Sequence, residues 1–461
     1  MKKTIREALN KESLTSFFGG YLYPPAVALV TLVGAISGLS IYACIINISL
    51  LITALLLGDS IKPLIINLTA FVYQISLDKS PFFPNYSNYF FTGWRVVTLS
   101  LLAIGLVFAL GYYVIKNKLY SDISLKRTPL LLPLLVFSLA LLLNGAFSGV
   151  WTFKNLVYAL AQIIAHLFVF LLFYQGLKKE KTEELGKYFA YVSALLSLII
   201  ISELVFLFAT GDNIFIDGSI NKVAVSLGWG IWNLIGISLT VLIPMIFYGM
   251  EKNKYPWFYF ALATLTWIFA VSTMSRNALI FASLSYASCI LIFSFKGKHK
   301  KALRIVSLLG LAFVLAIAVV FFDKIYSLFR DFFERGFSDN GRFALWSAAL
   351  QAFKSAPVFG KGFYGTALIT DAFGALPESA HNTVLQLLSA SGVVGFLAYT
   401  YFRFKSVIPF VKKPSVLKTL LGISILSLLF GSMLDNFVFD IYPTFYTSIA
   451  LAITLISLKE E

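Results

Sequence analysis

Charged residues are scarce in this 461-residue chain, since Asp, Glu, Lys and Arg together make up 13% of it while 59% is hydrophobic. The mean hydropathy of +0.84 leaves too little polar surface to coat a water-soluble globule. This composition excludes an ordinary soluble enzyme or binding domain and indicates an integral membrane protein.

Cysteine and histidine are also rare. The only two cysteines, Cys44 and Cys289, both lie within hydrophobic runs, which excludes a C-x-x-C metal or redox motif and argues against a disulfide. The three histidines, His166, His299 and His381, are too far apart in the sequence to suggest a metal site, and no Asp-x-Asp pair occurs in a predicted outer loop. We therefore expect neither a metal nor another cofactor.

Long hydrophobic runs dominate the sequence, and most are about as long as the ~30 Å hydrocarbon core of a bilayer requires of a helix. They predict an all-α, polytopic membrane protein with about 12–14 transmembrane helices, forming a single membrane domain over residues 1–461. The predicted spans are 20–37, 39–58, 61–77, 93–115, 129–146, 156–177, 188–210, 229–249, 256–273, 278–295, 305–322, 381–404, 418–438 and 443–458.

Basic residues cluster in every second loop, for example in KNKLYSDISLKR, KKEKTEELGK and KGKHKKALR. Loops rich in Lys and Arg stay on the cytoplasmic side of a membrane. We therefore place both termini in the cytoplasm of a multi-pass protein in the cytoplasmic (inner) membrane. The net charge of +15 then reflects topology and gives no reason to expect a nucleic-acid partner.

One loop is much longer than the others. Residues 323–380 fall on the predicted outer side, and two stretches in them, KIYSLFRDFFERGF and RFALWSAALQAF, place aromatic and aliphatic residues at helical spacing. We expect two amphipathic helices on the membrane surface, forming a cap over an active site on the outer face.

The stretch SAHNTVLQLLSASGVVG (379–395) begins where this loop re-enters the bilayer. Ser379 is a candidate N-cap, which would place His381 in the first helical turn, and helical spacing puts Gly392 and Gly395 on the same face as His381. Asn382 begins a neighbouring polar stripe. A helix N-terminus favours anions and disfavours imidazolium, so a neutral His381 beside an anionic ligand could accept a proton. A capping or interfacial role for His381 is the alternative.

Several cations lie near the same predicted face. Arg276 stands at the start of a span with almost no loop before it, a costly position for an arginine without an anionic partner or a wet cavity. Arg342, Arg335 and Lys361 belong to the long loop. Because guanidinium binds phosphate oxygens bidentately, these residues are candidate phosphate ligands, with pairing to loop carboxylates or snorkelling as the alternative.

Other polar features have simpler interpretations. GKGFYG (360–365) matches the dinucleotide fingerprint by letter but lacks the strand and helix that the fingerprint requires, so we expect a glycine-rich turn. His166, in the middle of a span, suggests a structural, hydrogen-bonded histidine. Glu203 and Asp435 also fall within spans, and either could handle protons or pair with an arginine.

Taken together, these motifs resemble those of the O-antigen ligase and polymerase superfamily. The resemblance consists of H-N, nine residues and G-x-x-G (381–395), a long loop with G-R-F-A-L-W and P-V-F-G-K-G-F-Y-G, and S-R-N-A-L at a helix start. It covers roughly residues 230–400. It implies a GT-C-like, inverting, metal-independent glycosyltransferase that moves a glycan from a polyprenyl pyrophosphate carrier to a sugar hydroxyl.

The resemblance also implies roles for residues. His381 matches the essential histidine of the superfamily, Arg276 an arginine assigned to the pyrophosphate, and Arg342 the loop arginine; Asn382, Lys361 and Arg335 are possible supporting residues. Phe396 and Leu397 replace the G-T-V ending sometimes seen in ligases.

We therefore favour a polymerase of O-antigen, capsule or exopolysaccharide repeat units. A ligase that uses a lipid or cell-surface acceptor, a polysaccharide-lipid transporter or flippase, and an inactive assembly scaffold are the alternatives. The expected partners are the lipid-linked donor, a glycan or lipid-glycan acceptor, membrane lipid and polysaccharide-assembly proteins.

Overall fold

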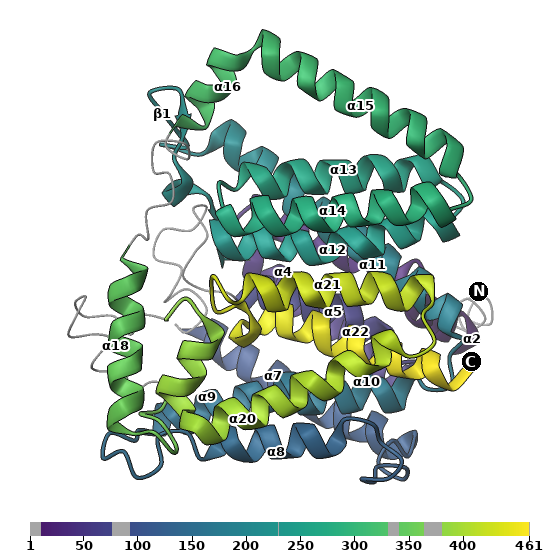
Figure 1. Ribbon diagram of the computed structural model, residues 1–461. Helices are drawn as coiled ribbons and strands as arrows, with labels where there is room; N and C mark the ends of the chain where they lie inside the picture. Colours follow the sequence, from purple (N-terminus) through teal and green to yellow (C-terminus); the bar gives the residue numbers. More distant parts are fainter. Residues whose placement is uncertain (1–10, 76–92, 229, 331–340, 364–379, 461) are drawn as a thin grey trace. The chain divides into compact units, whose positions relative to one another are not determined.

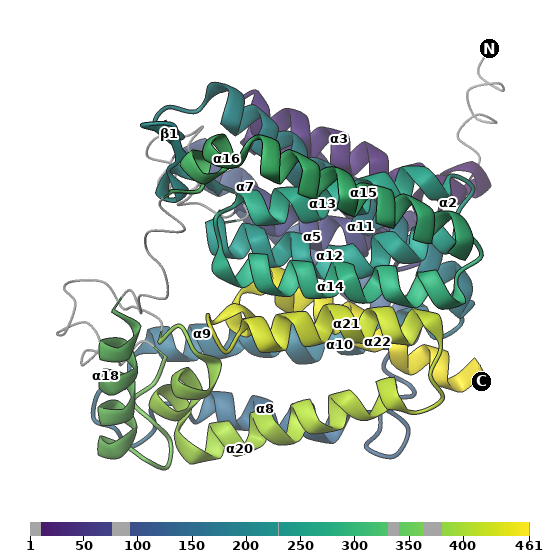
Figure 2. The ribbon, with the colours of Figure 1, turned by 45° about the horizontal axis from the view of Figure 1, so that its top comes forward.

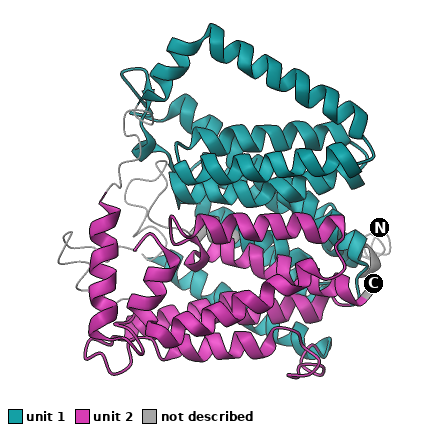
Figure 3. Ribbon diagram, in the orientation of Figure 1, with its two compact units in different colours: residues 1–118, 179–336 teal, residues 119–178, 337–461 magenta. Residues whose placement is uncertain are grey.

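The computed structural model describes residues 11–75, 93–228, 230–330, 341–363 and 380–460. The chain divides into two compact units (Figure 3). Unit 1 comprises residues 1–118 and 179–336, and unit 2 comprises residues 119–178 and 337–461. Each unit is therefore built from two separate stretches of chain.

Unit 1 is a helical bundle. Its elements are α2 (Lys11–Gly19), α3 (Tyr23–Ile36), α4 (Ser40–Leu57), α5 (Pro63–Ile75), α7 (Trp94–Lys116), α11 (Thr182–Thr210), β1 (Phe215–Ile216), β2 (Ser219–Ile220), η2 (Lys222–Ala224), β3 (Ser226–Leu227), β4 (Gly230–Ile231), α12 (Trp232–Lys252), α13 (Pro256–Ser272), α14 (Arg276–Lys296), α15 (Lys300–Val320) and α16 (Phe322–Leu328). Figures 1 and 2 show α12 running alongside α13 and α14.

Helix α12 is the most enclosed helix of unit 1, because almost every residue from Ile235 to Met250 is buried. It packs against α11, α13 and α14. Small residues permit this close approach: a Cβ on Gly236 would collide with Ala278 of α14, and one on Gly249 with the ring of Tyr259 of α13. In contrast, few residues of α7 and α15 are fully buried, and both helices expose many apolar side chains, as lipid-facing helices do.

Unit 2 holds the re-entering end of the long loop. Its elements are α8 (Leu131–Leu142), α9 (Phe153–Ile163), the π-helical segment η1 (Ile164–Phe168), α10 (Val169–Leu177), α18 (Arg342–Ser355), α20 (Thr383–Val411), α21 (Val416–Gly431), η3 (Phe437–Phe439) and α22 (Ile441–Glu460). Helix α20 packs against α8 and α18, and α22 packs against α10 and α21 (Figure 1).

The helical prediction is confirmed. Within the described residues, nine helices are long and apolar enough to cross a membrane, and four shorter apolar helices, α3, α8, α13 and α21, accompany them. Each predicted span coincides with a helix or a run of helical segments. The chain is therefore an all-α, polytopic membrane protein, as the hydrophobic runs predict.

The long loop is described in part. Of its two predicted helices, RFALWSAALQAF forms α18, and the first stretch begins in α16. Residues 331–340 and 364–379, including Arg335 and the predicted N-cap Ser379, lie outside the described residues. The loop from Gly211 to Gly228 contributes short antiparallel pairings, β1 with β2 and β3 with β4, that the sequence did not predict.

Candidate active site

His381 immediately precedes α20 and does not lie within its first turn, contrary to the expectation from the sequence. Asn382 is the N-cap, because its side chain accepts a hydrogen bond from the Leu385 amide at 3.1 Å. His381 itself has a left-handed backbone, with φ +47°. Non-glycine residues in this conformation store strain and are found preferentially at functional sites.

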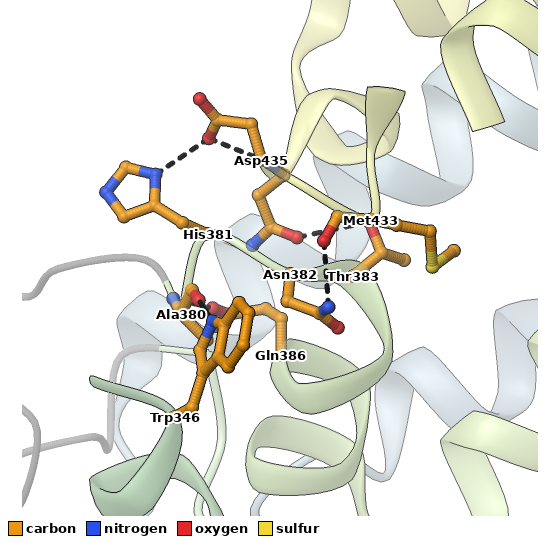
Figure 4. Close-up of polar contacts among 9 residues, drawn as sticks. Trp346, Ala380, His381, Asn382, Thr383, Gln386, Met433 and Asp435 are labelled. Atoms are coloured by element: carbon orange, nitrogen blue, oxygen red, sulfur yellow. Dashed lines mark hydrogen bonds and ion pairs between the residues drawn. The ribbon is translucent and has the colours of Figure 1, made fainter. Parts of the chain in front are cut away.

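The His381 ring is paired with a carboxylate from a distant part of the chain. Its Nδ1 lies 2.8 Å from Oδ1 of Asp435, which follows α21 (Figure 4). The His381 side chain is 32% exposed and that of Asp435 is 12% exposed. An ionised carboxylate only accepts hydrogen bonds, so the pairing places a proton on Nδ1 and leaves the lone pair of the neutral ring on Nε2.

The backbone before His381 is held on both sides. The Ala380 amide donates to Oε1 of Gln386 at 2.8 Å, and Nε1 of Trp346 donates to the Ala380 carbonyl at 3.0 Å (Figure 4). Ala380 is fully buried against Leu345 of α18 and Leu385 of α20. Two helices therefore fix the residue that precedes the histidine.

The residues after His381 are tied to the segment that carries Asp435. Nδ2 of Asn382 donates to the Met433 carbonyl at 2.9 Å, and the Thr383 amide donates to the Ser432 carbonyl at 2.9 Å. Oδ1 of Asp435 also accepts from the Asn436 amide at 2.9 Å. These contacts hold the end of α21 beside the start of α20, so the imidazole and the carboxylate keep their relative positions (Figure 4).

Helix α20 is broken at Gly392, whose φ of +63° and ψ of −164° are not helical. The prediction that His381, Gly392 and Gly395 share one helical face is therefore wrong. A segment of the long loop made of turns fills the break: the Val393 amide donates to the Pro357 carbonyl at 2.9 Å, and the Gly362 amide donates to the Ala390 carbonyl at 2.8 Å. Backbone groups of α20 lose hydrogen bonds within the helix at this break, and they bond to the inserted segment instead.

Glycine is required on both sides of this junction. A Cβ on Gly392 would collide with the Val358 carbonyl, and one on Gly360 would collide with the Ala390 backbone. Gly360 and Gly362 also have positive φ, +68° and +87°. The G-x-G of the apparent nucleotide fingerprint is thus a glycine-rich turn, as predicted, and its function here is to let the loop enter the broken helix.

Two of the predicted phosphate ligands lie in unit 2, on segments that contact α20. Arg342 is the first residue of α18 and is half-buried, one turn before Trp346. Lys361, also half-buried, follows Gly360 in the loop that fills the α20 break, and its amide donates to the Ser389 carbonyl at 2.8 Å. The structure thus brings the predicted His381, Asn382, Arg342 and Lys361 into one unit.

Arg276 belongs to unit 1. It is the first residue of α14, directly after the N-cap Ser275, whose side chain accepts from the Ala278 amide at 3.3 Å. Met274, before the cap, has a left-handed φ of +59°. Arg276 is half-buried at this helix start, which agrees with its predicted position at the very end of a span.

The other residues noted in the sequence lie elsewhere. Glu203 is buried in α11 of unit 1, and His166 is buried in the π-helical segment of unit 2. Cys44 and Cys289 are buried free thiols, so the expectation of no disulfide between them is confirmed. Within the described residues, no group of three or more His, Cys, Asp or Glu side chains could hold a metal ion.

Sequence reasoning missed the role of Asp435 and did not single out Trp346. Asp435 was noted as a polar residue in a span, but no local pattern links it to His381, 54 residues earlier. The signal that could have pointed to Asp435 is the string LDNF, which lies between two apolar runs just after α21 ends. Trp346 occurs within the recognised G-R-F-A-L-W string, but nothing in that string predicts its bond to Ala380.

A comparison with known protein families supports the resemblance found in the sequence. A family model described as O-antigen ligase matches residues 260–400, which include α14, α18, His381 and the break in α20. No curated protein matches the chain. Over this region the chain is similar to the O-antigen ligase and polymerase superfamily, and the match supports a membrane glycosyltransferase of the ligase or polymerase type.

Proposed function

We propose that this protein transfers a glycan from a polyprenyl pyrophosphate carrier to a sugar hydroxyl, and that it polymerises repeat units of a cell-surface polysaccharide. The observation that carries this proposal is the His381–Asp435 pair at the entrance of α20, in which His381 lies inside the region similar to O-antigen ligases. A histidine held by a carboxylate is suited to removing the proton of a hydroxyl.

His381 acts as the general base. Asp435 accepts a hydrogen bond from Nδ1–H and fixes the ring, so Nε2 takes the proton of the acceptor hydroxyl as its oxygen attacks the anomeric carbon of the donor. The new glycosidic C–O bond forms as the C–O bond to the pyrophosphate breaks. Attack opposite the leaving group inverts the anomeric centre, and correctly placed proton transfer of this kind contributes ~10²- to 10⁴-fold in rate.

The departing pyrophosphate needs cations, because negative charge develops on it as the bond breaks. Arg342 is suited to this role because α18 is bonded through Trp346 to the residue before His381. The resemblance of the sequence to O-antigen ligases supports Arg276 as the second pyrophosphate ligand, with Lys361 and Arg335 in support. Guanidinium groups already in position stabilise such charge without having to reorganise during the reaction.

The proposed setting is the outer face of the cytoplasmic membrane. The isoprenoid tail lies in the bilayer while the glycan and the acceptor approach from outside, where the basic-loop pattern places His381. Polysaccharide-assembly proteins are the expected partners. The reaction proposed uses no nucleotide sugar, because the carrier already holds the activated glycan.

A product assay tests this proposal. Purified protein in detergent is given a polyprenyl-pyrophosphate oligosaccharide in the presence of a chelator, and the products are separated on a gel. A ladder of increasing length establishes a polymerase; a single transfer that requires an added lipid acceptor establishes a ligase. If a panel of donors stays unchanged while the protein moves them across vesicles, the protein is a transporter and the proposal is wrong.

The arginines are tested in the same assay. Arg276→Ala is expected to abolish turnover while the protein remains folded and membrane-inserted, because the leaving group loses its counter-charge. Arg95→Ala, at another half-buried arginine in the first turn of a unit 1 helix, α7, is the matched control and should retain activity. Full activity of Arg276→Ala would show that Arg276 does not bind the donor.

A further inference from the structure

A second cluster of polar side chains lies inside unit 2 and consists of residues that the proposed reaction does not use. Gln162 of α9, His166 of η1, and Tyr399 and Arg403 of α20 form this buried cluster. Their exposed fractions are 1%, 3%, 7% and 8%. Ionisable and polar groups so deep in a membrane protein are costly and generally mark a binding or transport site.

Aromatic rings join the members of the buried cluster. The Phe137 ring meets the His166 ring edge-on at 5.5 Å and the Tyr399 ring at 5.5 Å, and it stacks on Phe402 at 5.9 Å. The Arg403 guanidinium lies over Phe402 at 4.7 Å. The histidine, the phenol and the guanidinium therefore surround one pair of stacked rings.

Arg403 points into the bundle. Its guanidinium lies over the rings of Phe402 and Tyr399, which precede it, so the side chain runs toward the N-terminal end of α20 and away from Val411 at the nearer end. Snorkelling to the nearer membrane surface would require the opposite direction. Within the described residues, no carboxylate forms an ion pair with Arg403.

The hydrogen-bonding capacity of the buried cluster is not filled. Nδ1 of His166 bonds the Gln162 carbonyl at 3.1 Å, and Nε2 of Gln162 donates to the Phe439 carbonyl at 2.7 Å. This leaves two acceptors, Nε2 of His166 and Oε1 of Gln162, and two donors, Nε of Arg403 and the hydroxyl of Tyr399, without hydrogen-bond partners among the described residues.

We infer that the buried cluster binds a singly charged phosphate group that retains at least one O–H, namely a phosphate monoester or dihydrogen phosphate. Its oxygens accept from Arg403 and Tyr399, and its O–H donates to His166 or Gln162. One negative charge neutralises Arg403, and the mixture of donors and acceptors distinguishes this group from sulfate, which has no O–H. The group comes either from a lipid head group or from free phosphate.

This inference is independent of glycosyl transfer, because it concerns other residues and needs no donor or acceptor. The π-helical turn at Ile164–Phe168 agrees with this inference, because such turns occur frequently at functional sites and this one carries His166 of the cluster.

The test uses the full-length protein in nanodiscs, with thermal unfolding followed at increasing ligand concentration. One arm adds inorganic phosphate to phosphatidylcholine discs, and the other uses discs containing phosphatidic acid in phosphate-free buffer. A ligand that binds only the folded protein stabilises it by RT ln(1 + [L]/Kd), so the Tm keeps rising as the ligand concentration exceeds Kd. We expect a concentration-dependent rise in at least one arm, and none with equimolar sulfate; the arm that responds identifies the source.

Variants connect the Tm rise to the cluster. Arg403→Met should abolish it, and Tyr399→Phe, which keeps the ring and removes only the hydroxyl, should weaken the apparent affinity about tenfold. Lys405→Met is the matched control: Lys405 lies on the same helix near the Tyr401 ring but is exposed. No rise in Tm in either arm would mean that the cluster holds only water. A rise in Tm for Tyr399→Phe equal to that of the wild type would mean that phosphate binds elsewhere. Either result overturns the inference.

Discussion

Asp435 lies 2.8 Å from the imidazole of His381, although 54 residues separate them in the chain. The two are brought together because the end of α21 is hydrogen-bonded to the start of α20 through Thr383 and Asn382. A carboxylate that orients an imidazole and fixes its tautomer is a common device for activating a histidine. The proposed chemistry rests on this pair, and its consequences are measurable.

Asp435→Asn should lower kcat by ~10²-fold or more and leave the KM of the donor little changed, because the ring loses the partner that fixes its tautomer. The substitution is close to isosteric, so the fold should survive. In the double variant with His381→Ala, the loss should equal that of His381→Ala alone, since Asp435 acts through the histidine. Additive losses in steady-state assays would show that Asp435 acts separately.

Trp346→Phe removes the indole N–H that bonds the Ala380 carbonyl while keeping an aromatic ring in place. We expect kcat to fall several-fold, because the backbone beside His381 gains freedom, and the free energy of unfolding to fall by about 1 kcal/mol. Leu350→Ala, at an exposed side chain on the same helix, is the control and should behave like the wild type. A change in donor KM alone would contradict the positioning role.

Gly392→Ala should destabilise the protein by well over about 1 kcal/mol, because the residue has φ +63° and its new Cβ would collide with the Val358 carbonyl. The measurement is the Tm in detergent. Gly111→Ala, in α7, meets no atom within 4 Å and is the matched control, with little or no effect expected. Equal Tm values for the two variants would show that the loop does not fill the break in α20.

The proposed orientation predicts the labelling of introduced cysteines. Phe147→Cys, at a 94% exposed position in a predicted outer loop, should react with a membrane-impermeant maleimide on intact cells. Ser124→Cys, exposed in a predicted cytoplasmic loop, should react only after the cells are opened. Cys44 and Cys289 are buried and give little background. The reverse pattern would place His381 on the cytoplasmic face.

The membrane helices were predictable from the sequence because a bilayer requires every spanning backbone to satisfy its own hydrogen bonds, which ties the length of an apolar run to a helix. The candidate residues His381, Asn382 and Arg342 were also identified, because polar residues beside such runs stand out. The predicted spans accordingly coincide with helices from α3 to α22.

The sequence could not predict the long-range pairings. The spacing of Gly392 from His381 fits a continuous helical face as well as a break, and only the inserted loop at Pro357–Gly362 decides between them. The bond between His381 and Asp435 likewise depends on how α20 and α21 pack. Both are tertiary effects that override a local pattern, and both occur at the candidate active site.

The central claim is that His381 removes the proton of the acceptor hydroxyl. The most direct measurement is single-turnover consumption of a polyprenyl-pyrophosphate oligosaccharide, with acceptor, by purified wild type and His381→Ala at matched Tm. The account predicts that His381→Ala binds the donor normally but turns it over ~10²- to 10⁴-fold more slowly. A rate close to that of the wild type would contradict it.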